Sequence, residues 1–146
     1  MPINRIDTAV AAFTEGFSCS QAVFSTFAEE LGLDRTAALK VSTAFGGGMA
    51  GMGMACGAVT GALMVIGAKH GRVEASDDAA KQKTYEISRE FIRVFTERHG
   101  SIACRDLLGV DISTPQGREQ AKANDLFKTL CPRLVADAVE ILERII

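Results

Sequence analysis

Apolar side chains recur every three or four positions along most of the chain, the spacing that gathers them on one face of an α-helix. The clearest case is "DDAAKQKTYEISREFIRVFTERHG", where Ile87, Phe91 and Phe95 share one face and the charged Glu90 and Arg93 share the opposite face. No segment alternates apolar and polar residues between turn residues, which is the pattern typical of a β-strand. The sequence therefore predicts an all-α protein.

The residues at the helix ends divide this pattern into elements. Ser76, followed by two aspartates, is the expected cap at the start of the long amphipathic helix, and Gly100 is its expected end. Ser101 is the expected cap of a short helical turn around Cys104. Neither an internal repeat nor a dividing linker is present, so residues 1–146 are expected to form a single-domain helical bundle. The expected helices are residues 3–14, 20–31, 35–44, 57–68, 77–99, 116–130 and 132–145.

One segment is apolar on every side and is the expected centre of the bundle. Residues 41–68 contain no charged side chain, and about 20 apolar residues would be enough to cross a bilayer. The first half, which includes "GGGMAGMG", is rich in glycine, and each glycine costs a helix about 1 kcal/mol relative to alanine. Only residues 57–68 form a continuous apolar helical pattern, which is too short for a span. A buried, Gly-rich central helix is therefore predicted, and no membrane insertion is expected.

Charge and the N-terminal residues limit the class of protein. The net charge is -2, and Lys and Arg are interspersed with Asp and Glu, so binding to nucleic acid is not expected. Arg5, Asp7 and Glu15 fall where a secretory signal would need its apolar core. We therefore expect a cytoplasmic protein, in which cysteines stay reduced rather than forming permanent disulfides.

Each of the four cysteines is expected at the start of a helix. Cys19 opens the second expected helix, Cys56 precedes the central one, Cys104 lies in the short turn, and Cys131 precedes Pro132, a residue favoured at the first helical position. The first turn of a helix has free N–H groups and a partial positive charge, so a thiolate there is stabilised and its pKa is expected to fall below about 8.5. Sulfurs that meet in the fold could then share a metal cluster or exchange disulfides.

These residues alone leave other interpretations open. Cysteine is among the most buried residue types, so all four could simply fill gaps in the core, and their spacing matches no zinc-finger, thioredoxin or ferredoxin pattern. A formal G-x-G-x-x-G between Gly46 and Gly51 lacks the preceding strand and the later acid of a dinucleotide site. Met49, Met52 and Met54 are soft ligands that raise copper as a possibility, although packing around a buried site is the favoured interpretation.

The order of the cysteines resembles the C_GCAxxG_C_C family, whose pattern has four cysteines with a C-G-A-x-x-G motif at the second. That motif is present here as Cys56, Gly57, Ala58 and Gly61 in "CGAVTG". "FSCSQAVF" supplies the first cysteine, and "ACRDLLG" and "LCPRLV" supply the third and fourth. The resemblance covers nearly the whole chain and implies a redox role. The implied site residues are Cys19, Cys56, Cys104 and Cys131 as ligands, with Gly57 beside them.

The chain is also similar to the helical portion of split-Soret cytochromes, in which an iron–sulfur centre accompanies haem. The sequence has no C-x-x-C-H haem-attachment motif, so only the iron–sulfur half of that similarity applies. The leading hypothesis is therefore an electron-transfer protein whose four cysteines bind an iron–sulfur cluster, with [2Fe–2S] favoured.

Two other hypotheses remain open. The first is a metal-free thiol–disulfide redox protein, for which Cys56 and Cys104 are the candidate redox-active thiols. The second is a structural zinc site or a helical interaction module. No general base or oxyanion site is evident, so whether the chain is an enzyme stays open. The resemblance implies an unidentified redox partner protein and a functional link to a transporter, and the apolar C-terminal "VADAVEILERII" would allow a homodimer.

Overall fold

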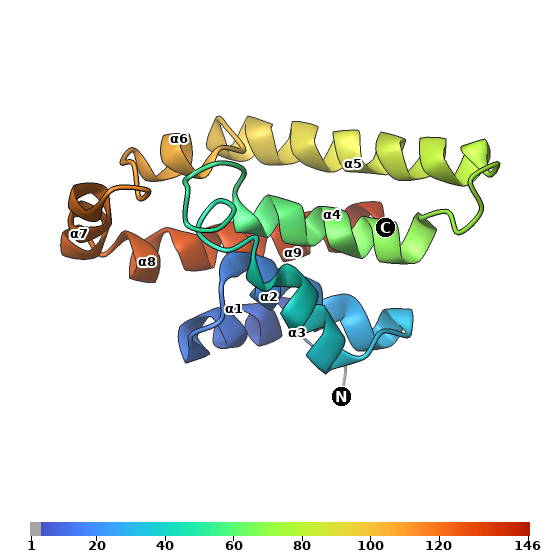
Figure 1. The fold of residues 1–146 in the computed structure, drawn as a ribbon, viewed down its shortest axis with the longest axis horizontal. Helices are drawn as coiled ribbons and strands as arrows, with labels where there is room; N and C mark the ends of the chain where they lie inside the picture. The colour runs from blue at the N-terminus through green and yellow to red at the C-terminus, as the bar shows by residue number, and fades with distance from the viewer. Residues whose placement is uncertain (1–3) are drawn as a thin grey trace.

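The computed structural model describes residues 4–146, which form α-helices joined mostly by short loops (Figure 1). Within these residues the one strand-like pairing is an isolated antiparallel bridge between Ala55 and Ala103, so the all-α prediction is confirmed. The elements are α1 (Arg5–Glu15), α2 (Cys19–Ala28), the 3₁₀ helix η1 (Glu29–Leu31), α3 (Arg35–Thr43), α4 (Gly57–His70), α5 (Asp78–His99), α6 (Cys104–Leu108), α7 (Pro115–Ala123), α8 (Leu126–Thr129) and α9 (Cys131–Ile145).

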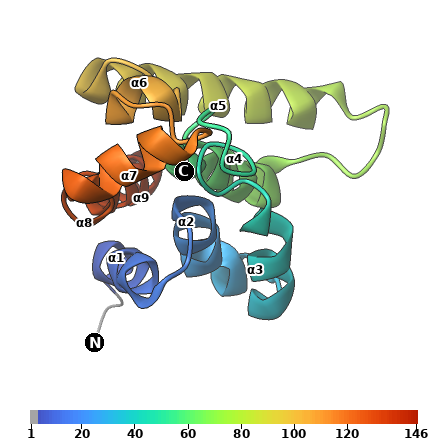
Figure 2. The same cartoon turned by 60° about the vertical axis from the view of Figure 1, so that its left-hand side comes forward.

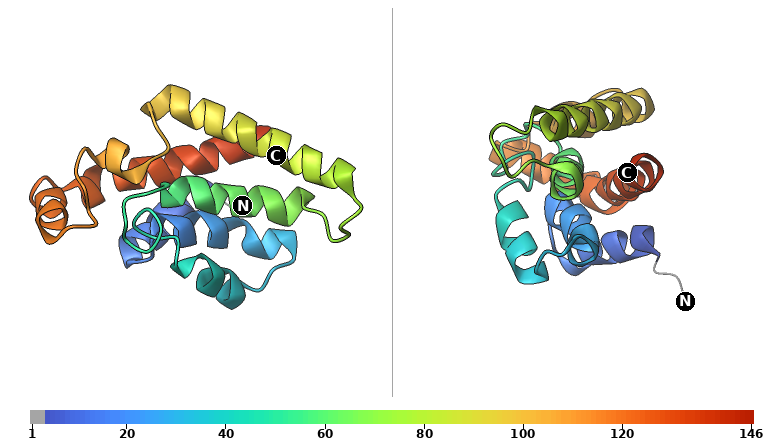
Figure 3. Two further views of the ribbon diagram at one scale, coloured as in Figure 1. Left: turned by 45° about the horizontal axis from the view of Figure 1, so that its top comes forward. Right: turned by 90° about the vertical axis from the view of Figure 1, so that its right-hand side faces the viewer.

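The helices are arranged in layers around α4. Figure 1 shows α5 on one side, α4 and α9 in the middle, and α1 to α3 on the other side. The turned views keep this order, and α6, α7 and α8 lie together beside the end of α9 where that helix begins (Figures 2 and 3). This arrangement covers α4 with helices from both halves of the sequence.

The predicted buried central helix is confirmed as α4. Its residues 57–67 are all buried or half-buried, and it contacts α2, α5 and α9. Val59, Val65 and Ile66 are among the fully buried side chains of the core. None of the helices in residues 4–146 combines the length and the apolar composition needed to cross a membrane.

Several expected helix boundaries differ from the structure. Asp77, not Ser76, caps α5, and its side chain accepts the Ala80 N–H at 3.1 Å. The single helix expected at residues 116–130 is divided into α7 and α8, because Asp125 has a left-handed φ of 54° that an α-helix does not accommodate. The expected start of the first helix at Ile3 lies outside the described residues.

The expected cap of the short helix is also shifted. Ala103, not Ser101, is the cap residue of α6. The Ser101 hydroxyl still accepts the Ala103 N–H at 3.0 Å and donates to the Asp106 carboxylate at 2.9 Å. Ser101 therefore supports the approach to Cys104 from outside the helix rather than from its cap position.

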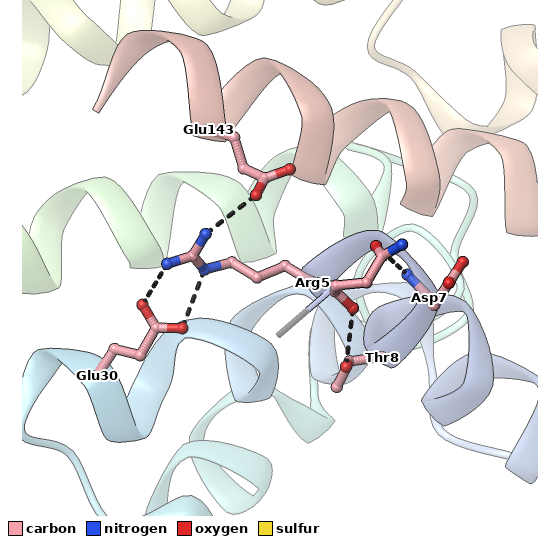
Figure 4. Close-up of polar contacts among 6 residues, drawn as sticks. Arg5, Asp7, Thr8, Glu30 and Glu143 are labelled. Carbon is pink, nitrogen blue, oxygen red and sulfur yellow. Dashed lines mark hydrogen bonds and ion pairs between the residues drawn. The ribbon is translucent and has the colours of Figure 1, made fainter. Parts of the chain in front are cut away.

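The side chain of Arg5 links α1, η1 and α9 (Figure 4). The guanidinium of Arg5 in α1 donates to both carboxylate oxygens of Glu30 in η1 at 2.9 and 2.7 Å. Its third nitrogen donates to Glu143 near the end of α9 at 3.0 Å. Because Glu30 follows α2 and Glu143 lies in the last turns of α9, these contacts fix the ends of the two helices that begin at Cys19 and Cys131.

Candidate functional site

The glycine-rich segment between α3 and α4 is a hydrogen-bonded coil. Gly47, Gly48, Gly51 and Gly53 all have positive φ, as do Met49 at 72° and Ala50 at 54°. Backbone carbonyls in and just before the coil accept N–H groups from residues six positions later. The Ala44 carbonyl accepts the Ala50 N–H at 2.7 Å, and the Gly48 carbonyl accepts the Met54 N–H at 2.7 Å. Glycines allow this path because they adopt positive φ without the steric cost of a side chain. The coil lies beside α6 in Figures 1 and 2.

Gly48 shows why a side chain is excluded from the inner face of the coil. A Cβ atom at this position would lie 2.7 Å from the Cβ of Cys104 and 2.7 Å from the backbone nitrogen of Met54. The backbone of the coil therefore lies directly against Cys104. The packing prediction for the methionines is wrong: Met49, Met52 and Met54 are 37%, 55% and 53% exposed, because the coil turns their side chains outward.

A short backbone pairing positions two of the cysteines. The N–H of Cys56 donates to the carbonyl of Ile102 at 2.7 Å, and the N–H of Cys104 donates to the carbonyl of Met54 at 2.6 Å. The Arg105 N–H continues the pairing to Gly53 at 3.0 Å. The start of α4 and the start of α6 are therefore held side by side, although 47 residues separate Cys56 from Cys104 in the printed sequence.

The other two cysteines lie at the starts of α2 and α9. Ser18 caps α2 through a capping box with Gln21, which places Cys19 at the first helical position. Cys131 is the first residue of α9 and is followed by Pro132. With Cys56 at the cap of α4 and Cys104 at the start of α6, the prediction that every cysteine lies at a helix N-terminus is confirmed.

All four cysteines line one cavity of about 190 Å³, which we call the thiol cavity. Cys56, Cys104 and Cys131 are buried, and Cys19 is half-buried. The cavity has mostly apolar walls and no charged residue in its lining. The walls are completed by Phe13, Ser18, Gly47, Gly48, Gly57, Leu107, Leu108, Ile112, Phe127 and Leu134. The structure therefore brings the predicted ligand set and Gly57 together, whereas the apolar and aromatic walls had no signal in the sequence.

The four cysteines do not form a site for a single metal ion within residues 4–146. Among residues 4–146, no group of three or more His, Cys, Asp or Glu side chains is arranged to hold a single metal ion. All four cysteines are free thiols rather than disulfide partners. The four cysteines instead lie on the walls of the thiol cavity.

Burial opposes the thiolate form of all four cysteines. It raises the pKa of Cys104 to about 12, with a further increase from the charges of Cys56 and Cys131. It also raises the pKa of Cys56 to about 11, although the N–H groups of Ala58 and Val59 donate to its sulfur and lower the pKa in part. The expectation that helix N-termini lower the thiol pKa values is therefore wrong at Cys56 and Cys104, because desolvation in the apolar cavity is the larger effect.

Cys19 and Cys131 form a hydrogen-bonded pair of sulfurs. The contact raises the pKa of Cys19, with burial adding to the effect, because Cys19 keeps its proton and donates it. The same hydrogen bond lowers the pKa of Cys131, despite its burial. Negative charge in the cavity therefore forms first on Cys131, where a neighbouring thiol rather than the helix supplies the stabilisation.

Comparisons with known proteins agree with the order and position of these cysteines. A family model described as "Putative redox-active protein (C_GCAxxG_C_C)" matches residues 17–145, a range that contains every lining cysteine of the thiol cavity. No curated protein matches the chain, and no solved structure matches it.

Proposed function

Since the chain belongs to the C_GCAxxG_C_C family of redox-active proteins, we propose that it is an electron-transfer protein whose thiol cavity holds an iron–sulfur cluster. The observation that carries the proposal is that Cys19, Cys56, Cys104 and Cys131, from four separate helices, line one cavity. Four cysteine thiolates are the usual ligand set of both [2Fe–2S] and [4Fe–4S] clusters, and [2Fe–2S] is the form we favour.

The arrangement of the four cysteines around one cavity supports a group larger than one ion. A tetrahedral zinc ion needs its sulfurs at about 2.3 Å from a common centre, whereas a cluster core spreads its ligands over several iron atoms. The described residues hold no three-ligand group suited to one ion, but they do place four thiols on the walls of one space. The donor set and the cavity therefore fit a cluster better than a single zinc ion.

The residues around the cavity would perform three tasks. Cys19, Cys56, Cys104 and Cys131 would bind the cluster after losing their protons, so loading should release protons and should be favoured by higher pH. The N–H groups of Ala58 and Val59, which donate to the Cys56 sulfur, would offset negative charge. The apolar walls would exclude water. When bound, the cluster supplies one-electron redox chemistry.

The test is anaerobic reconstitution of the protein with iron and sulfide. We expect visible charge-transfer absorption and about two irons and two sulfides per chain for the [2Fe–2S] form. Single Cys→Ser variants at the four positions should each lose or sharply reduce this content while keeping the helical circular-dichroism spectrum. Ile112→Val is the matched control, because Ile112 lines the same cavity and offers no ligand atom. A colourless protein without stoichiometric iron and sulfide would contradict the proposal.

The contact between Cys19 and Cys131 favours a second candidate, a metal-free dithiol. Two thiols in hydrogen-bond contact can form a disulfide by losing two protons and two electrons to an oxidant such as a small disulfide. The sequence named Cys56 and Cys104 as the candidate pair, and the contact between Cys19 and Cys131 adds a second candidate pair. Mild oxidation with oxidised glutathione, followed by peptide mapping, should then yield the 19–131 disulfide in a colourless protein. Mapping that finds only free thiols would exclude this candidate.

A further inference from the structure

A second hollow lies on the surface immediately outside the thiol cavity. This hollow, the outer pocket, has a volume of about 510 Å³ and is lined by Phe13, Thr14, Phe17, Phe127, Lys128 and Pro132. Phe13 and Phe127 also line the thiol cavity. Pro132 directly follows Cys131 at the start of α9. Two phenyl rings therefore form a shared wall between the outer pocket and the candidate redox site.

The walls of the outer pocket suit a flat aromatic ligand. Phe13, Phe17 and Phe127 supply three phenyl rings, and aromatic rings stack on one another in offset or edge-to-face geometry. The volume lies within the range of about 300–1,000 Å³ that is usual for small-molecule sites. A planar ring system in this position would be separated from the thiol cavity by the Phe13 and Phe127 side chains.

A basic extension adjoins the aromatic walls. A neighbouring hollow of about 380 Å³ is lined by Lys122, Asp125, Phe127 and Lys128, and it shares Phe127 and Lys128 with the outer pocket. Two ammonium groups and one carboxylate give this end a net positive charge. The combined surface is therefore aromatic at the end nearest the cysteines and favourable to an anionic group at the other end.

We propose that the outer pocket binds flavin mononucleotide, with the ring against the phenylalanines and the phosphate at Lys122 and Lys128. This inference rests on the proposed function, because it names the electron carrier that would serve the thiol cavity. The shared wall supports the placement: the flat redox-active part of the ligand lies on the side of the cysteines, and the charged part lies on the side of the lysines.

Titration of the intact protein with flavin mononucleotide, followed by calorimetry, tests the proposal, with riboflavin as the probe that lacks phosphate. We expect saturable binding of flavin mononucleotide and weaker binding of riboflavin. Lys128→Glu should weaken flavin mononucleotide binding about fivefold, the effect of reversing one exposed charge, and should leave riboflavin unchanged. Lys128 is exposed, so this substitution leaves the core intact.

A substitution that fills the outer pocket tests the aromatic end of the proposed flavin site. Thr14 is exposed, and its hydroxyl donates only to the Val10 carbonyl of the same helix, at 2.9 Å. The new side chain in Thr14→Phe should occupy the outer pocket and weaken the binding of both ligands at least tenfold, which is about 1.4 kcal/mol. Thr8→Phe is the matched control, because Thr8 is an exposed residue of the same helix that lines a different hollow with Ser25 and Glu29. It should bind both ligands as the wild type does.

Equal binding by Thr14→Phe and wild type would overturn the proposal, as would the absence of saturation up to about 1 mM flavin mononucleotide. Iron and sulfide are measured on the same preparations, so the two proposals fail separately. Normal cluster content without flavin binding rejects only the outer-pocket site. Flavin binding that responds to Thr14→Phe in a protein that never loads iron supports the site and rejects the cluster.

Discussion

Gly61 of α4 lies directly against the backbone of Ser20 in α2. A Cβ atom at position 61 would approach the Ser20 carbonyl oxygen to 2.8 Å, its Cα to 3.1 Å and the Val23 Cβ to 3.2 Å. Gly57, one turn earlier, has the same relationship with the Ser20 nitrogen at 2.9 Å and with the Cys19 Cβ at 3.1 Å. The two glycines of "CGAVTG" therefore let α2 and α4 pack closely, and this packing places Cys19 beside Cys56.

Gly61→Ala should destabilise the fold by about 1–3 kcal/mol, the usual cost of overpacking a close contact, because the obstructing atoms are mainly backbone. Gly67→Ala is the control in the same helix, since a Cβ there meets nothing within 4 Å. Alanine at position 67 should be neutral or should stabilise by about 0.5–1 kcal/mol through helix propensity. Urea denaturation followed by circular dichroism measures both. A neutral Gly61→Ala would show that the helices separate freely.

The helices were predictable because their signals are local. Apolar periodicity located α5, the continuous apolar segment at residues 57–68 located α4, and Pro132 after Cys131 marked the start of α9. The break between α7 and α8 was not predicted because it lies at Asn124 and Asp125, where neither glycine nor proline marks the end of a helix. Two such residues in succession can indicate a helix break, since Asn and Asp tolerate the left-handed conformation better than most residues do.

Of the candidate site, only the four cysteines were predictable. The cysteine order identified Cys19, Cys56, Cys104 and Cys131, but their meeting point depends on the packing of α2, α4, α6 and α9. The local helix-terminus argument gave the wrong direction for the pKa of Cys56 and Cys104, because burial is a property of the whole fold. Phe13 and Phe127, which wall the cavity, come from opposite ends of the chain and carry no motif.

His70 makes stability depend on pH. Burial lowers its pKa below the usual 6.5, with help from Lys83 and Lys69. The unfolded chain therefore binds a proton before the folded protein does, so the free energy of unfolding falls as the pH drops below about 6.5 and stops responding below the folded pKa. Above about pH 7.5 the group is neutral in both states and contributes no pH dependence.

His70→Gln should remove this part of the acid sensitivity. Urea denaturation at about pH 8, 6.5 and 5.5 should show that the wild type loses more stability on acidification than the variant does. The Nε2 atom of His70 is buried and has no hydrogen-bond partner among the described residues, so the substitution removes no bond from that atom. Parallel pH curves for the two proteins would contradict the assignment.

Arg5 should contribute measurably to stability although it lies partly in solvent. It bridges Glu30 and Glu143, and its guanidinium also lies 5.5 Å from the centre of the Phe27 ring. Arg5→Gln should lower the free energy of unfolding by about 1 kcal/mol, the upper end for exposed ion pairs, because one planar group serves two carboxylates from different elements. The difference should shrink in about 1 M salt.

Arg93 supplies the control for Arg5. It also pairs with two carboxylates, Glu90 and Glu97, but all three residues belong to α5, and their side chains are 45% to 64% exposed. Arg93→Gln should therefore cause no detectable change in the denaturation midpoint. Equal effects of the two substitutions would show that the contacts between elements at Arg5 add nothing beyond the local charge pairing.

Alkylation of the reduced, metal-free protein should begin at Cys131. The hydrogen bond from Cys19 lowers the pKa of Cys131, whereas burial raises the pKa of Cys56 to about 11 and of Cys104 to about 12. Raising the pH therefore produces thiolate first at Cys131, and thiolate is the form that reacts with iodoacetamide. Mass spectrometry of digests across a pH series should show the Cys131 peptide modified at the lowest pH.

Two variants at position 19 test the role of the hydrogen bond. Cys19→Ser replaces the sulfur donor by a hydroxyl and should keep this order, whereas Cys19→Ala removes the donor and should raise the pH at which Cys131 reacts. An unchanged Cys131 profile in Cys19→Ala would contradict the hydrogen-bond assignment.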